Sequence, residues 1–177
     1  IGLNLSKQFL PIFLLILLIL VWTSVWSLFK IAIEAIPPLS FRVIIGVPAF
    51  ALLLFLGFKK VKTVYVPKSD IKPLLLISFF NVTLWQVLML YGINLLGGGR
   101  AAVLTYTMPV WATIFASIFG YEKITISIII SLIFGLTGIL FLSLEINIFD
   151  NLSGFLITLC AGLSWAIGTM IVKYGGI

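Results

Sequence analysis

Six long runs of hydrophobic residues follow one another along the chain and are separated by short polar or glycine-rich breaks. The runs cover residues 9–29, 39–58, 73–96, 101–120, 124–144 and 152–172. An α-helix of about 20 apolar residues crosses the hydrocarbon core of a bilayer. The pattern therefore predicts an all-α integral membrane protein with six transmembrane helices. Because the connections are short, consecutive helices are expected to be antiparallel neighbours.

The composition agrees with lipid as the main solvent of the chain. Of the 177 residues, 62% are hydrophobic and 9% are charged, and the mean hydropathy is +1.30. A soluble domain needs a more charged exterior than this. The formal net charge of +6 does not indicate nucleic acid, because the lysines cluster in one loop between two spans. The lipid bilayer is the expected surrounding.

The distribution of lysine and arginine predicts the orientation in the membrane. The connection between the second and third runs holds most of the lysines: Lys59, Lys60, Lys62, Lys68 and Lys72. Loops rich in Lys and Arg stay in the cytoplasm. This favours a cytoplasmic N-terminus in a multi-pass protein of the plasma (inner) membrane.

The residue types disfavour catalysis. Histidine is absent, Cys160 is the one cysteine, and neither an acidic pair at metal-ligand spacing nor a nucleophile motif is found. We therefore expect no enzyme activity, no catalytic residue, no metal and no cofactor.

Two segments near the ends of the chain share a short pattern. Trp22 and Lys30 are separated by seven residues, as are Trp165 and Lys173. The first and sixth helices should cross the membrane in opposite directions, so the pattern favours an inverted repeat, as in many secondary transporters. We expect residues 1–148 to form a five-helix repeat and residues 149–177 to form the first helix of a second, incomplete one. The chain would then be a fragment, whose partner is a missing second repeat or a second copy.

Several motifs resemble one family of transporters. They are Trp22 and Lys30 in the first helix, "PPLSFR" at 37–42, "YGINLLGGGRAAVLTYTMPVWA" at 91–112 and "GYEK" at 120–123. With these motifs the whole chain resembles the drug/metabolite transporter superfamily, and within it the ten-helix EamA-type permeases. The resemblance implies a transporter whose central cavity is completed by helices that are not in this chain.

Polar and aromatic side chains recur at helical spacing inside the first, third, fourth and sixth runs. Such groups are costly in hydrocarbon unless they face protein or water. The candidates for lining a substrate cavity are Thr23, Trp26, Ser27, Lys30, Asn81, Trp85, Gln86, Thr105, Tyr106, Pro109, Trp165 and Thr169. Pro109 is expected to kink the fourth helix near Thr105.

Other roles for these residues stay open. Hydroxyl and amide groups also bond helices to one another. Lys30 could reach toward the interface, meet a substrate carboxylate or phosphate, or pair with Glu34. Ser131 and Gly135 in the fifth helix are expected to form a packing surface.

These patterns predict a secondary transporter for small metabolites, such as amino acids or related compounds, that works by alternating access. Every acidic residue lies near a helix end or in a loop, which favours a uniporter, an exchanger or a gradient-driven exporter over proton coupling. The alternative is a non-transporting assembly or anchoring protein whose polar stripes only pack helices together.

Overall fold

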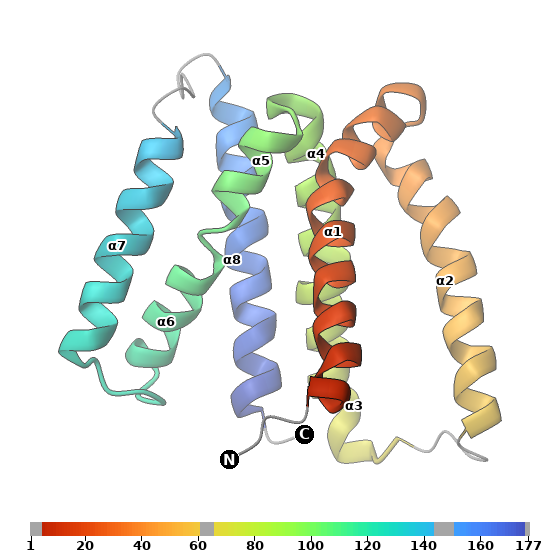
Figure 1. The fold of residues 1–177 in the computed structure, drawn as a ribbon, viewed down its shortest axis with the longest axis horizontal. Helices are drawn as coiled ribbons and strands as arrows, with labels where there is room; N and C mark the ends of the chain where they lie inside the picture. The colour runs from red at the N-terminus through yellow and green to blue at the C-terminus, as the bar shows by residue number, and fades with distance from the viewer. Residues whose placement is uncertain (1–4, 61–65, 144–150, 176–177) are drawn as a thin grey trace.

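The structure is a computed structural model that describes residues 5–60, 66–143 and 151–175, and helices make up nearly all of it (Figure 1). The first two spans are α1 (Leu5–Ala35) and α2 (Pro38–Lys60). The third consists of α3 (Lys68–Ile77), a π-helical segment η1 (Ser78–Leu84) and α4 (Trp85–Leu96). The fourth consists of α5 (Gly98–Thr105) and α6 (Met108–Ile118), and the last two are α7 (Ile126–Ser143) and α8 (Leu152–Tyr174). The prediction of an all-α integral membrane protein is confirmed.

Five of the spans are long and apolar enough to cross a bilayer, and α7 contributes a shorter apolar helix over Ile126–Phe141. The helices differ from the predicted runs mainly at their ends. α1 continues to Ala35, six residues beyond the predicted end at residue 29, because nothing before Pro37 and Pro38 interrupts it.

The last helix, α8, lies in the middle of the bundle. It packs against α4, α6, η1, α5 and α3, and Figure 1 shows it between α6 on one side and α4 on the other. Its buried positions are small residues: Gly154, Thr158, Ala161, Gly162, Ser164, Ala166 and Gly168. Small residues let helix backbones approach closely, which is how helices associate where lipid removes the hydrophobic driving force.

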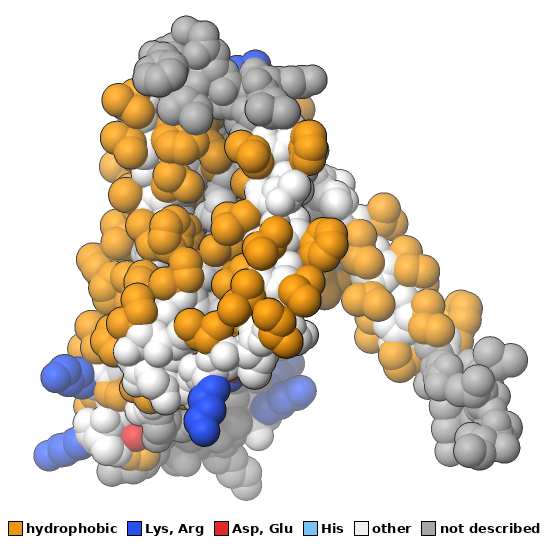
Figure 2. All heavy atoms as spheres, turned by 90° about the vertical axis from the view of Figure 1, so that its left-hand side faces the viewer, with side chains coloured by type: hydrophobic (Ala, Val, Ile, Leu, Met, Phe, Trp, Pro, Cys, Tyr) orange, Lys and Arg blue, Asp and Glu red, His pale blue; other side chains and the backbone are white. Residues whose placement is uncertain are grey.

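The first helix packs along only part of its length. Residues 9–24 of α1 are exposed, and its buried positions are Trp26 and Ile33. In Figure 2 a column of hydrophobic side chains leans out to the right of the body, which is the side nearest the viewer in Figure 1, where α1 lies in front of α4. The packed part of α1 therefore begins near Trp26.

The fourth span is broken rather than bent. α5 ends at Thr105 and α6 begins at Met108, with Pro109 in its first turn. Proline has no amide hydrogen and is tolerated at a helix start, where that hydrogen has no partner. The sequence predicts a kink here, and the structure shows two helices joined at Tyr106 and Thr107.

The π-helical segment was not expected from the sequence. Its last bond runs from the backbone N–H of Trp85 to the carbonyl oxygen of Phe80. The same carbonyl accepts a hydrogen bond of 2.7 Å from the Ser164 hydroxyl of α8. One extra residue per turn rotates the following helix, and such segments often mark functional sites. Here it sets the direction of Trp85, the first residue of α4.

Candidate functional site

A small hollow lies where α1, α2 and α4 meet. Its volume is about 180 Å³, and its lining residues are Trp22, Val25, Trp26, Phe29, Arg42, Trp85, Gln86 and Met89. The α1 residues recur at three- and four-residue steps, which puts them on one face of the helix. The hollow brings together three of the predicted site residues: Trp26, Trp85 and Gln86.

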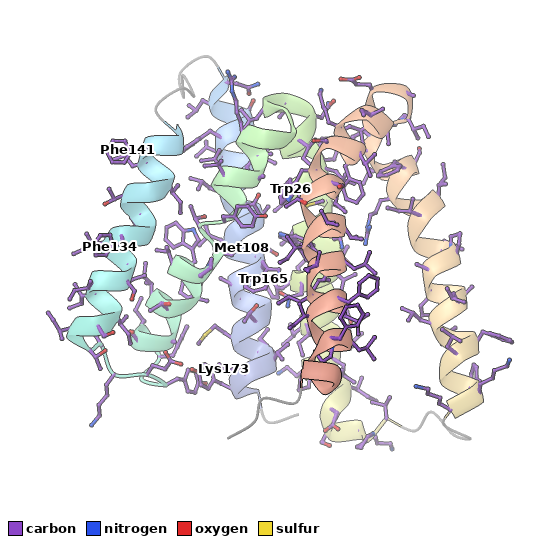
Figure 3. The ribbon with its side chains drawn as sticks, in the orientation of Figure 1. Trp26, Met108, Phe134, Phe141, Trp165 and Lys173 are labelled. Carbon is purple, nitrogen blue, oxygen red and sulfur yellow. The ribbon has the colours of Figure 1, made fainter. Side chains whose placement is uncertain are left out.

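An aromatic pair joins α1 to the break in the fourth span. The ring centroids of Trp26 and Tyr106 are 6.2 Å apart and the ring planes are tilted by 59°, within the range of favourable aromatic contacts. Trp26 is 7% exposed, whereas Tyr106 is 50% exposed. Figure 3 labels Trp26 on α1. One side of this pair is therefore packed into the core, and the other is open.

A second hollow separates α6 from α7. It has a volume of about 320 Å³, and its polar lining comes from Tyr106, Thr113, Glu122, Ser127 and Ser131, with Pro109 and Gly135 beside them. The expectation that Ser131 and Gly135 form a packing surface is wrong, because a Cβ atom at Gly135 would have no neighbour within 4 Å. Tyr106 and Pro109 are the predicted site residues that this hollow contains.

Of the three α1 candidates outside the hollows, two lie on the surface and Lys30 is half-buried. Thr23 and Ser27 are exposed, and the Thr23 hydroxyl donates to the Ile19 carbonyl oxygen at 2.8 Å. Lys30 pairs with Glu34, with 3.5 Å between Nζ and Oε1. Of the roles considered for Lys30, the structure shows this pairing.

The remaining candidates pack against other helices or fill the interior. Thr105 is fully buried, and its hydroxyl donates to the Ala101 carbonyl oxygen at 2.7 Å. The Asn81 side chain abuts Gly168 of α8, and its Oδ1 is buried without a hydrogen-bond partner. Trp165 packs beside the core cluster that contains Met108 (Figure 3), and Thr169 is partly buried.

A polar cluster at the end of α8 was missed by the sequence analysis. Glu122, which follows the fourth span, accepts hydrogen bonds from Lys173 and, at 2.7 Å, from the Tyr174 hydroxyl. The Tyr174 ring stacks on Tyr121, with centroids 4.1 Å apart and planes 4° apart. The hydrogen bonds from Lys173 and Tyr174 and the charge of Lys173 lower the pKa of the Glu122 carboxyl. The signals were present in the sequence, as "GYEK" and as the repeated Trp–Lys spacing, but neither shows that the two segments meet.

Comparison with known proteins gives the family. The model of the EamA-like transporter family matches residues 9–144. The chain is 32% identical over 160 residues to the uncharacterized transporter YoaV of Bacillus subtilis, covering 87% of this chain and 54% of that protein. It is 28% identical over 173 residues to the uncharacterized inner membrane transporter YedA of Escherichia coli K12, covering 93% of this chain and 54% of that protein.

The chain spans about half the length of these relatives, and no solved structure matches it. The family model covers most of the chain, including the aromatic pair, the broken fourth span and α7. The polar and aromatic positions described above thus lie within a multi-pass membrane protein that belongs to the EamA-like transporter family.

Proposed function

We propose that this chain forms half of a secondary transporter that moves small metabolites, such as amino acids, by alternating access. Residues 1–148 would be the first five-helix repeat, and residues 149–177 would begin the second. The observation that carries the proposal is the break in the fourth span, which leaves the half-exposed Tyr106 ring against the buried Trp26 ring. A broken helix with exposed polar groups at membrane depth is tolerated where it lines a cavity or contacts protein.

The hydrogen bonds argue against the alternative that the polar stripes serve only to hold helices together. The hydroxyls of Thr23 and Thr113, two residues that are not buried, donate to carbonyl oxygens of their own helices. Each hydroxyl therefore has a hydrogen-bond acceptor in its own helix and does not bond a neighbouring helix. This leaves their lone pairs available to a solute or to water.

The placement of charge favours a cytoplasmic N-terminus. α2 ends in Lys59 and Lys60 at the same end of the bundle as the start of α1 (Figure 1). On the face shown in Figure 2, most Lys and Arg side chains gather at that end. Because positively charged loops stay on the cytoplasmic side of the membrane, this end would lie on the cytoplasmic side of the inner membrane.

Flux of labelled amino acids into liposomes tests transport by the full-length protein. Tyr106→Ala should reduce flux by about tenfold, equivalent to about 1.4 kcal/mol of interaction free energy, because it removes the open half of the aromatic pair. Tyr91→Ala is the matched control, since Tyr91 is also exposed but lies on α4, outside both hollows. Equal flux in the two variants at equal folded yield would contradict the proposal.

A further inference from the structure

We propose that the hollow between α1, α2 and α4 binds the carboxylate of a small aromatic or aliphatic solute through Arg42, Trp85 and Gln86. This inference rests on the proposed transport function and names the class of its substrate. It adds Arg42, which is not among the cavity candidates named from the sequence, and it assigns to the hollow a preference for negatively charged ligands.

The walls of the hollow are mainly apolar, and three of its lining residues supply the hydrogen-bond donors on which this proposal rests. The Arg42 guanidinium has five N–H donors and no acceptor, the Trp85 indole has one donor, and the Gln86 amide has two donors beside its oxygen. All three side chains line the same space. A ligand that only accepts hydrogen bonds and carries negative charge complements this set.

One of these donors is left without a partner. Trp85 is 8% exposed, and its Nε1 atom is buried with no hydrogen bond among the described residues. A buried donor is costly unless an acceptor reaches it. The bound carboxylate would supply that acceptor.

Arg42 differs from the two cations that are paired. Lys30 has Glu34 and Lys173 has Glu122, whereas no carboxylate among the described residues forms an ion pair with Arg42. It is partly buried and lies near the N-terminus of α2, where the helix dipole adds positive potential. An unpaired, partly buried cation in a membrane span is a functional-site signal, and its planar fork matches a carboxylate.

The walls and the volume limit what accompanies the carboxylate. The rings of Trp22, Trp26 and Phe29 and the side chain of Met89 line the hollow. Phe29 is held by an edge-on contact with Phe41, with centroids 5.3 Å apart. A dry apolar cavity of about 150 Å³ can hold benzene, so about 180 Å³ accommodates one ring or a short aliphatic group. The single Arg42 charge favours a monocarboxylate over a phosphate dianion.

Binding to the purified full-length protein in detergent, followed by tryptophan fluorescence, tests the site. The probes are phenylacetate, the amine phenethylamine and the neutral 2-phenylacetamide, which share one ring and differ in charge. We expect phenylacetate to bind at least tenfold more tightly than either of the others. Equal affinity for phenylacetate and phenethylamine would overturn the proposal.

Variants locate the binding in the hollow. Arg42→Gln should weaken phenylacetate binding by tenfold or more, and Trp85→Phe by severalfold. The matched control is Arg100→Gln, since Arg100 is exposed on α5 and does not line the hollow. If Arg42→Gln does not fold, Arg42→Lys keeps the charge without the fork and should weaken binding severalfold. Unchanged affinity in the folded Arg42 variant would overturn the proposal.

Flux measurements separate this inference from the proposed function. If phenylacetate binds through Arg42 but no solute crosses liposome membranes, the site stands and transport fails. If neutral or cationic solutes cross and carboxylates neither bind nor compete, transport stands and the carboxylate site fails.

Discussion

The close contact between α5 and the backbone of α1 should be necessary for the position of Trp26. Gly98, the first residue of α5, lies so near α1 that a Cβ atom there would be 2.7 Å from the Trp26 carbonyl oxygen and 3.1 Å from its carbonyl carbon. Because both atoms belong to the backbone, no side-chain rotation relieves the clash. An ordinary contact begins at 3.4 Å, so Gly98→Ala must move the two helices about 0.7 Å apart.

The size of the effect follows from two opposing terms. Overpacking of this kind costs about 1–3 kcal/mol, while replacing glycine by alanine in a helix returns up to about 1 kcal/mol. We expect Gly98→Ala to lower the free energy of unfolding by about 1–2 kcal/mol. The displacement also carries the Trp26 ring away from Tyr106, so flux should fall in the molecules that remain folded.

The neighbouring glycine provides the control. A Cβ atom at Gly99 would have no neighbour within 4 Å, so Gly99→Ala should be neutral or stabilising by about 0.4–1 kcal/mol. Unfolding of the purified protein in mixed micelles, followed by tryptophan fluorescence, compares the two variants. If Gly98→Ala is as stable as Gly99→Ala and transports at the same rate, the close approach does not position Trp26 and the reasoning is refuted.

Two further predictions concern the contacts of α8. The hydrogen bonds and charge that lower the pKa of Glu122 stabilise the fold above the ordinary pKa of 4.5, and this stabilisation is lost as the pH falls through the lowered pKa. The melting temperature of the wild type should therefore exceed that of Glu122→Gln at pH 7, and the difference should shrink in acid. A difference in melting temperature that does not depend on pH would contradict the ion pair. Ser164→Ala should reduce the free energy of unfolding by about 0.5–1.5 kcal/mol, because it removes the hydrogen bond to the Phe80 carbonyl. The control is Ser131→Ala, which should have a smaller effect in the same unfolding assay, because the Ser131 hydroxyl bonds only within its own helix.

The sequence predicts which segments enter the membrane but not which of their faces meet. Length and hydropathy set the spans, and the proline at position 109 predicts an interruption, because both act locally. The packed face of each helix cannot be predicted in this way. In lipid, a leucine side chain is as stable against the bilayer as against a neighbouring helix, so no apolar stripe marks the packed face. This is why neither the exposure of α1 before Trp26 nor the central place of α8 could be predicted.

The parts of the site that escaped prediction depend on contacts between distant residues. Ser164 and Phe80, whose bond supports the π-helical segment, are 84 positions apart, and Lys173 and Glu122 are 51 apart. The segment "SFFNVTL" gives no sign of a π-helical turn, because the Phe80 carbonyl at this turn is bonded by Ser164 of a distant helix. Trp85 and Arg42 could each be recognised as unusual in a membrane span, but their meeting in one hollow could not.

In the proposed alternating-access mechanism, the break in the fourth span would be the place where movement reaches the aromatic pair. α6 is linked at its lower end to α8 through Glu122 and Lys173, whereas α5 is fixed at its upper end by the contact of Gly98 with Trp26. Between them the fourth span lacks continuous helical hydrogen bonding, since Pro109 has no N–H to donate. The break is therefore the place where this span would bend, while α6 stays packed along α8. Tyr106 lies at the bend and against Trp26, so the aromatic pair is where alternating access through this chain would change the site.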